Sequence, residues 1–260
     1  MHLSQLKEND NKSKPRILVA IPAYNEETTI QHVVNTVRRH LPGLDLLVVN
    51  DGSSDATAKV LCQLKVTTAA HLCNLGYGRA IQTAIKYAQI NEYDMLVTLD
   101  ADGQHHPEQV RGMLEEFMLC EVDVMIGSRY IKAKNYSDSP LGRRIGMRLF
   151  SALTGTITQQ RVYDTTSGLK IIRRRAFEPL TKWQFVDFHA EAIIYLLRLG
   201  YRIGEYPITV SQRVHGQSMY SALSHIDYPL KTCMMVFLGV IQAGLNQRRN
   251  SYDRSGNNRT

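Results

Sequence analysis

The chain has 260 residues, of which 43% are hydrophobic and 21% charged, as in an ordinary globular protein with a sizeable core. No stretch reaches the roughly 18 apolar residues that a membrane-spanning helix needs, and we find no secretory signal. The four cysteines (Cys62, Cys73, Cys120 and Cys233) form no CxxC pair. These features argue against a disulfide-rich secreted protein or an integral membrane protein, and we expect reduced thiols in a cytoplasmic protein.

The formal charge of +7 is concentrated in one segment. Between Arg129 and Arg175, eleven Lys or Arg stand against two Asp, so this segment alone carries +9. Such a surface favours an anionic partner, namely phosphate groups, an acidic membrane face or nucleic acid, although a merely solvated basic face is the alternative. We disfavour nucleic acid because the basic residues are not interleaved with stacking aromatics and no recognition motif is present.

Strand-like and helix-like patterns alternate between two polar tails, residues 1–15 and 246–260. Apolar or β-branched runs predict strands at 17–22, 45–50, 66–72, 94–100 and 122–128. Amphipathic patterns predict helices at 30–41, within 51–64, through 80–87 and after Pro107. Successive strands joined by helices predict an α/β fold with a mainly parallel, doubly wound sheet.

Polar motifs follow the first four predicted strands. They read PAYNEE (22–27), NDGSSD (50–55), NLGYG (74–78) and DADGQ (100–104). Ligands of such sheets bind beyond the carboxyl ends of the strands. We therefore expect the four motifs to converge on one edge of the sheet.

The last of these motifs offers several oxygen ligands from one short turn. Asp100 and Asp102 lie two residues apart, and Gln104 follows at the same spacing. Carboxylates this close repel each other, and a hard cation such as Mg²⁺ or Mn²⁺ relieves that repulsion. The alternative is a solvated Asp-rich turn that ends a strand and precedes the helix beginning near Pro107. The spacing alone does not choose between the two.

Taken in order, IPAYNEE, VVNDGSSD, NLGYGRA and LDADGQHHPE resemble the family 2 glycosyltransferases with the GT-A fold. Motifs of the second half, GSRY (127–130), PLGRRI (140–145), DTTSGLK (164–170), HAE (189–191) and RVHGQS (213–218), resemble those of dolichyl- and polyprenyl-phosphate sugar synthases. The resemblance implies a three-layer, Rossmann-like GT-A domain with a mostly parallel central sheet at 16–218. An apolar helical segment at 219–245 and the basic tail at 246–260 complete the expected organisation.

The resemblance also implies a donor site for a GDP- or UDP-sugar. Asp100, Asp102 and Gln104 would bind the metal that bridges the donor diphosphate. The remaining nucleotide-sugar contacts would come from Pro22, Tyr24, Glu26, Asp51, Asn74, Gly76, Arg213 and Ser218. One position departs from the family pattern, because Met219 stands where relatives commonly carry a lysine after the serine.

On the acceptor side, the resemblance places Arg129 and Arg143 on a lipid phosphate, which a planar guanidinium grips bidentately. The alternative of surface arginines on a basic face applies more strongly to Arg144 and Arg148. Glu191 would shape the acceptor site, whereas we interpret Asp187 as a helix cap. Asp102, Glu191 and Arg129 are thus the predicted catalytic residues of an inverting, in-line displacement.

We therefore expect a metal-dependent hexosyltransferase that uses a polyprenyl phosphate acceptor at the inner face of a membrane. The apolar and basic segments 141–155 and 219–245 could lie in the membrane interface or pack against the sheet. The alternatives are an enzyme that glycosylates a hydroxyl of a glycan or small metabolite, and a regulatory protein that binds nucleotide-sugars without turnover. A phosphate monoester is already an anionic nucleophile, whereas a hydroxyl needs a general base.

Overall fold

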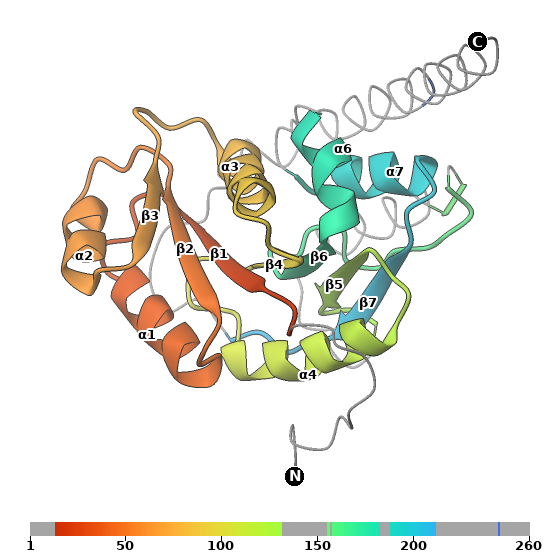
Figure 1. Ribbon diagram of the computed structural model, residues 1–260, viewed down its shortest axis with the longest axis horizontal. Coiled ribbons are helices and arrows are strands. Elements are labelled where there is room, and N and C mark those ends of the chain that lie inside the picture. Colours follow the sequence, from red (N-terminus) through yellow and green to blue (C-terminus); the bar gives the residue numbers. More distant parts are fainter. Residues whose placement is uncertain (1–13, 132–154, 157, 183–187, 212–243, 245–260) are drawn as a thin grey trace, which may run out of the picture.

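The computed structural model describes residues 14–131, 155–156, 158–182, 188–211 and 244. Within this part of the chain, seven strands form one sheet in the order β3-β2-β1-β4-β6-β5-β7 (Figure 1). The strands are β1 (Ile17–Ala23), β2 (Asp45–Asn50), β3 (Thr67–Ala70), β4 (Met95–Thr98), β5 (Val124–Ser128), β6 (Lys170–Arg173) and β7 (Ile203–Pro207). The helices are α1 (Ile30–His40), α2 (Thr57–Leu64), α3 (Tyr77–Ile90), α4 (Pro107–Leu119), α6 (Phe177–Lys182) and α7 (Ala190–Arg198), and a short 3₁₀ helix spans Arg174–Ala176.

The mainly parallel sheet predicted from the sequence is confirmed, with one insertion. The first three strands and β4 pair in parallel, as do β5 and β7. Two strands were not predicted, β6 and β7. Strand β6 lies between β4 and β5 and runs antiparallel to both. Its four residues come late in the chain yet enter the middle of the sheet, which no local pattern of alternation reveals.

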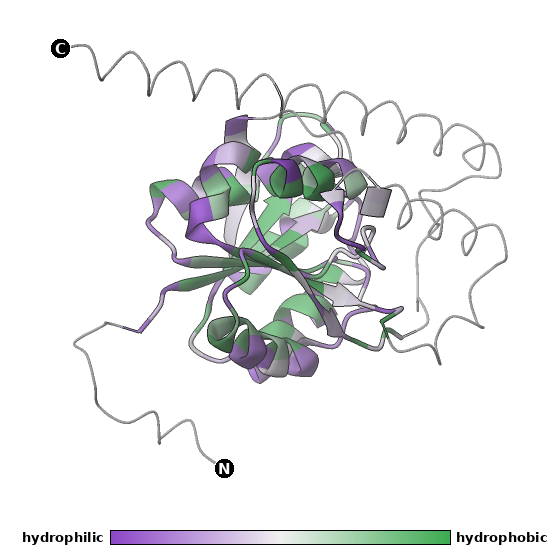
Figure 2. Cartoon of the chain, turned by 90° about the vertical axis from the view of Figure 1, so that its right-hand side faces the viewer, coloured by the Kyte–Doolittle hydropathy of each residue, from purple (hydrophilic) through white to green (hydrophobic). Residues whose placement is uncertain are grey.

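Helices cover both faces of the sheet, so the fold has three layers. Helices α1, α2 and α4 lie on one face and α3, α6 and α7 on the other (Figure 1). The buried strands are apolar on both sides, as a sheet covered on both faces requires. Figure 2 shows the hydrophobic colour concentrated in the sheet and on the inward helix faces. None of the helices in the described residues is both long and apolar enough to cross a membrane.

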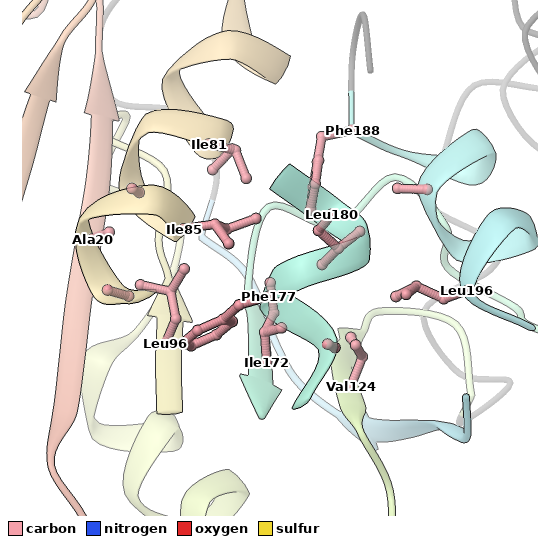
Figure 3. Packing of buried hydrophobic residues seen from close by; sticks show 14 of the residues in the cluster. Ala20, Ile81, Ile85, Leu96, Val124, Ile172, Phe177, Leu180, Phe188 and Leu196 are labelled. Carbon is pink, nitrogen blue, oxygen red and sulfur yellow. The ribbon is translucent and has the colours of Figure 1, made fainter. Parts of the chain in front are cut away.

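The core on the α3 face joins the two halves of the sheet. Ile81 and Ile85 of α3 pack with Phe177 and Leu180 of α6 over Leu96 of β4 (Figure 3). Each of these side chains is almost fully buried, and burial of one such group stabilises the fold by roughly 1.5–3 kcal/mol. Helices α3 and α6 are therefore held against β4, the strand that leads into the acidic turn.

The polar loops meet at the carboxyl ends of the parallel strands. Backbone hydrogen bonds continue the ladders into these loops, from Asp51 N to Ala23 O and from His71 N to Asn50 O. A third such bond runs from Leu99 N to Ala20 O, just before the acidic turn. The predicted convergence on one edge of the sheet is confirmed.

Candidate functional site

The loops after β1 and β2 are bonded to each other. Asn25 lies in the left-handed region with φ 55°, which asparagine tolerates better than most residues. Its side-chain Oδ1 accepts a hydrogen bond from Ser54 N at 2.9 Å, and its backbone N–H donates to Ser53 Oγ at 3.0 Å. The two loops therefore form one rim of the site.

Asp51 organises the loop that follows β3. Its Oδ1 accepts from Leu75 N at 2.9 Å and lies 2.6 Å from His71 Nδ1, while Oδ2 accepts from Gly76 N at 2.8 Å. The loop passes so close to Gly52 that an added Cβ would lie 2.3 Å from the carbonyl carbon of Cys73. A buried carboxylate and an adjacent glycine thus fix the course of residues 71–76.

The predicted nucleotide contacts in the described residues lie at this edge of the sheet. Pro22 is buried near the end of β1, whereas Tyr24 and Asn74 are exposed. The Glu26 backbone N–H donates to Thr57 Oγ1 at 2.8 Å, and Gly76 precedes α3 with φ 92°. The structure brings these loops together, while the role of each side chain toward a nucleotide stays a prediction.

The acidic turn begins at Asp100, whose carboxylate is held from two sides. Tyr77 Oη donates to Oδ1 at 3.2 Å, and His105 Nε2 lies 3.3 Å from Oδ2. Burial opposes ionisation of this group, but the hydrogen bond with His105 and the positive charge of Lys170 lower the pKa of Asp100 to about 2. The group is therefore a carboxylate across the physiological range of pH.

Asp102 and Gln104 occupy different environments in the same turn. The Asp102 side chain is only 9% exposed, and its Oδ1 accepts from Gln104 N at 3.0 Å. The Gln104 side-chain amide instead donates to Ser211 O at 3.1 Å, and Ser211 N donates to Gln104 O at 3.0 Å. Gln104 thus anchors the turn to the chain that follows β7.

The acidic turn fits a hard divalent cation that brings further ligands with it. Among the described residues, no group of three or more His, Cys, Asp or Glu side chains is placed to hold a metal ion. Mg²⁺ is usually bound by one or two carboxylates together with substrate phosphates and water. Asp100 and Asp102 supply two carboxylates of that kind.

Gly168 provides the surface on which the Asp100 carboxylate rests. A Cβ at this glycine would lie 2.0 Å from Asp100 Oδ2 and 2.1 Å from Oδ1. Thr98 Oγ1 fixes the contact, because it donates to Gly168 O at 2.6 Å and accepts from Lys170 N at 3.2 Å. The Asp100 carboxylate therefore packs against the segment that leads into β6.

Arg129 is paired with a buried carboxylate. Its Nε and Nη2 donate to the two oxygens of Asp164, both at 2.7 Å, and Nη2 also donates to Thr166 Oγ1 at 2.9 Å. Burial opposes the charge of Arg129, but its bonds to the 0%-exposed Asp164 raise the pKa of the guanidinium above its usual value. Because this geometry is bidentate and buried, Arg129 is no mobile surface arginine. Its Nη1 makes no hydrogen bond to any described residue.

Three further ionisable side chains belong to this part of the structure, of which Glu191 and Lys170 are buried and His189 is half-buried. Glu191 stands in the first turn of α7, and the preceding His189 stacks on the Tyr77 ring at 5.5 Å. Burial and the charge of Lys170 lower the pKa of His189 to about 3, so this imidazole is neutral at pH 7. Burial likewise lowers the pKa of Lys170 to about 8, against the attraction of Asp100, Asp164 and Glu191.

Several predicted residues lie outside the described residues. These are Arg143, Asp187, Arg213 and Ser218, together with Met219 and the segments 141–154 and 219–243. Conversely, sequence reasoning gave no role to five residues that build the site, namely Tyr77, His105, Asp164, Gly168 and Lys170. His105 directly follows the acidic turn, and the last three fall within the DTTSGLK motif, so those two stretches held the available signal.

Comparison with known proteins assigns the family. The sequence model described as Glycosyl transferase family 2 matches residues 18–181, more than half of the chain. The chain belongs to this family. This glycosyltransferase is 31% identical over 212 residues to a UDP-N-acetylglucosamine–dolichyl-phosphate N-acetylglucosaminyltransferase of Methanococcus voltae. The aligned region covers 74% of this chain and 84% of that protein.

Two other comparisons extend the likeness. A polyprenol monophosphomannose synthase of Mycolicibacterium smegmatis is 28% identical over 217 residues, covering 79% of this chain and 81% of that protein. The glycosyltransferase also shares its fold with a UDP complex of glucosyl-3-phosphoglycerate synthase from Mycobacterium tuberculosis, with TM-score 0.65 and 19% identity over 88% of this chain and 80% of that one. The three-layer GT-A architecture expected from the sequence is thereby confirmed.

Proposed function

We propose that this glycosyltransferase moves a hexose from a GDP- or UDP-sugar to a polyprenyl phosphate, with inversion at the anomeric carbon and with Mg²⁺ or Mn²⁺ as cofactor. The observation that carries the proposal is that two carboxylates, Asp100 and Asp102, and an oriented guanidinium, Arg129, follow the carboxyl ends of β4 and β5 at the same edge of the sheet. Carboxylates suit the metal of a diphosphate donor, and the guanidinium suits a phosphate acceptor.

The donor half of the reaction uses the acidic turn. The metal, when bound there, would neutralise charge on the diphosphate leaving group. Asp100 is held ionised and oriented by Tyr77 and His105, so it need not reorganise when the donor arrives. The loops fixed by Asp51 and Asn25 would receive the nucleoside at the same edge.

The acceptor half requires a nucleophile aligned opposite the leaving diphosphate. One oxygen of the acceptor phosphate forms the new bond to the anomeric carbon while the bond to the diphosphate oxygen breaks. A phosphate monoester is already anionic, so no protein base is needed. Arg129 would orient the phosphate through Nη1, since Nε and Nη2 are bonded to Asp164. A lipid acceptor also implies that the enzyme works at a membrane surface.

A hydroxyl acceptor is the second candidate, and the same ion pair favours it. The Asp164 carboxylate neutralises Arg129, which reduces the attraction that this arginine offers to a dianionic phosphate. Glu191, buried in the first turn of α7, is then the candidate general base on the acceptor side. We rank this candidate second because the curated relatives named above carry lipid phosphates in their names.

The test is nucleotide release from a panel of GDP- and UDP-sugars with Mn²⁺, with and without a short polyprenyl phosphate. Release that needs both metal and lipid phosphate supports the proposal and identifies the donor. Donor binding without stimulation by the lipid, but with stimulation by a free sugar or glycan, would replace it with the hydroxyl acceptor. A panel member hydrolysed equally with and without either acceptor would contradict both.

A further inference from the structure

Lys170 belongs to the segment against which the carboxylate of Asp100 packs. It opens β6 and pairs with Thr98 of β4 and Ile126 of β5, so it sits in the middle of the sheet with 1% of its surface exposed. Its ammonium donates to the carbonyl oxygen of Ser167. Ser167 precedes Gly168, the residue that seats Asp100, so ammonium and carboxylate contact consecutive residues of one segment.

The charges that face this ammonium are mostly negative. Asp100, Asp164 and Glu191 stabilise its protonated form, and Arg129 opposes it. Of these, Asp164 is already bound bidentately by Arg129. The remaining attraction of Lys170 is therefore directed to Asp100 and Glu191. In a buried site such charges are screened weakly, so each one changes the affinity for another ion.

We propose that Lys170 is a built-in counter-ion of Asp100 that weakens binding of a free divalent cation, so that the metal binds together with the donor diphosphate. The inference rests on the proposed function for the metal and the donor. A lone cation meets a carboxylate whose charge Lys170 already offsets, and only two carboxylates are offered by the turn. The negative charges of a diphosphate restore the attraction, which couples the two binding events reciprocally.

The sign of one measurement separates this role from a structural one. If Lys170 only held the fold together, its loss would weaken the metal site or leave it unchanged. If Lys170 acts as a counter-ion, loss of its charge leaves Asp100 with more uncompensated negative charge, and a free cation binds more tightly. In the counter-ion role, Lys170 acts on the metal through Asp100.

The experiment is titration of the full chain with Mn²⁺, followed by electron paramagnetic resonance, first alone and then with UDP or GDP. Lys170→Met removes the charge while keeping an unbranched side chain, and Lys170→Arg is the matched control that keeps the charge. We expect Lys170→Met to bind Mn²⁺ alone about tenfold more tightly than the wild type and Lys170→Arg to stay within about threefold. The nucleotide should enhance Mn²⁺ binding less in Lys170→Met than in the wild type. Equal or weaker binding of Mn²⁺ alone by folded Lys170→Met would overturn the inference.

Two safeguards keep the test decisive. Lys170→Gln is a second neutral variant for the case that Lys170→Met does not fold. In the wild type itself, equal Mn²⁺ affinity with and without nucleotide would overturn the inference. Asp102→Ala separates the two proposals. Wild-type Mn²⁺ binding by Asp102→Ala would place the metal elsewhere and contradict the proposed function, whereas loss of binding there with no effect of Lys170 variants contradicts only the counter-ion role.

Discussion

The two halves of the sheet hold their functional side chains by different means. In the first half, β3-β2-β1-β4, the loops are held mainly by hydrogen bonds to backbone N–H groups, as Asp51 binds Leu75 and Gly76. In the second half, β6-β5-β7, the corresponding work is done by buried charges, above all the Arg129–Asp164 pair. The difference matters because loss of one partner of a buried ion pair leaves the other charge uncompensated.

The acidic turn stands at the seam between these halves. Asp100 follows β4 of the first half, yet its carboxylate rests on Gly168 and faces Lys170 of the second. Thr98 bonds to both of these residues and ties the strands together. Changes in either half should therefore reach the acidic turn, and single substitutions can disturb one half at a time.

The largest effect is expected at the turn itself. Asp102→Ala removes one of the two carboxylates, and we expect metal-dependent turnover to fall by at least about a hundredfold. Because the hydrogen bond that Asp102 accepts from Gln104 N lies within the acidic turn and outside the hydrophobic core, thermal unfolding should change little. Glu108→Ala, which removes an exposed acid of the neighbouring helix, is the control and should keep full activity. Full metal-dependent activity in Asp102→Ala would remove this residue from the mechanism.

The next largest loss of activity should come from Gly168, where the two halves of the sheet meet at Asp100. Gly168→Ala introduces a Cβ that would lie 2.0 Å from Asp100 Oδ2, so the carboxylate must move. A displacement of about 1 Å at a reacting site can cost roughly a hundredfold in rate, and we expect a loss of that order in kcat together with weaker Mn²⁺ binding. The adjacent Ser167→Ala is the matched control, because the buried Ser167 Oγ makes no hydrogen bond in the described structure. Equal losses in both variants would point to general damage of the segment.

In the second half, the ion pair should dominate stability. Asp164→Asn keeps the shape but removes the fully buried charge opposite Arg129, and we expect the free energy of unfolding to fall by roughly 3–5 kcal/mol in urea denaturation. The exposed pair Arg202–Glu121 offers a comparison, since Glu121→Gln should cost less than about 1 kcal/mol. Similar costs for the two substitutions would refute the contrast between buried and surface charges.

The same contrast explains what could be predicted from the sequence. The first half repeats a strand, a polar turn and a helix, so its strands and the acidic turn at Asp100 follow from local pattern alone. The second half is built from residues distant in the chain, such as Arg129 and Asp164, and from β6, an antiparallel insertion of four residues. Local periodicity carries no information about such pairings. Lys170 illustrates the limit, because a lysine in a basic segment predicts a solvated side chain and not a buried one.

A smaller effect should appear in the acid dependence of stability. The bonds with Arg129 lower the pKa of Asp164 against the opposing effect of burial. A carboxyl with a lowered folded-state pKa stabilises the fold above its unfolded value of about 3.9 and loses that contribution as the pH falls toward the folded value. The wild type should therefore lose stability below about pH 4 more steeply than Asp164→Asn. Parallel curves for the two proteins in acid denaturation would show that Asp164 does not contribute.

The smallest change is expected in the first half, where Asp51→Asn keeps a side chain of the same size. Asparagine can still accept hydrogen bonds through its one oxygen, but its amide nitrogen cannot accept the bond from Gly76 N or Leu75 N that the second oxygen took. We expect unfolding to be easier by about 1–2 kcal/mol, and the loop at 71–76 to bind the donor less well. Donor KM should rise while acceptor KM stays unchanged, since the Arg129–Asp164 pair is untouched. A rise in both constants would mean that the two halves do not hold their loops independently.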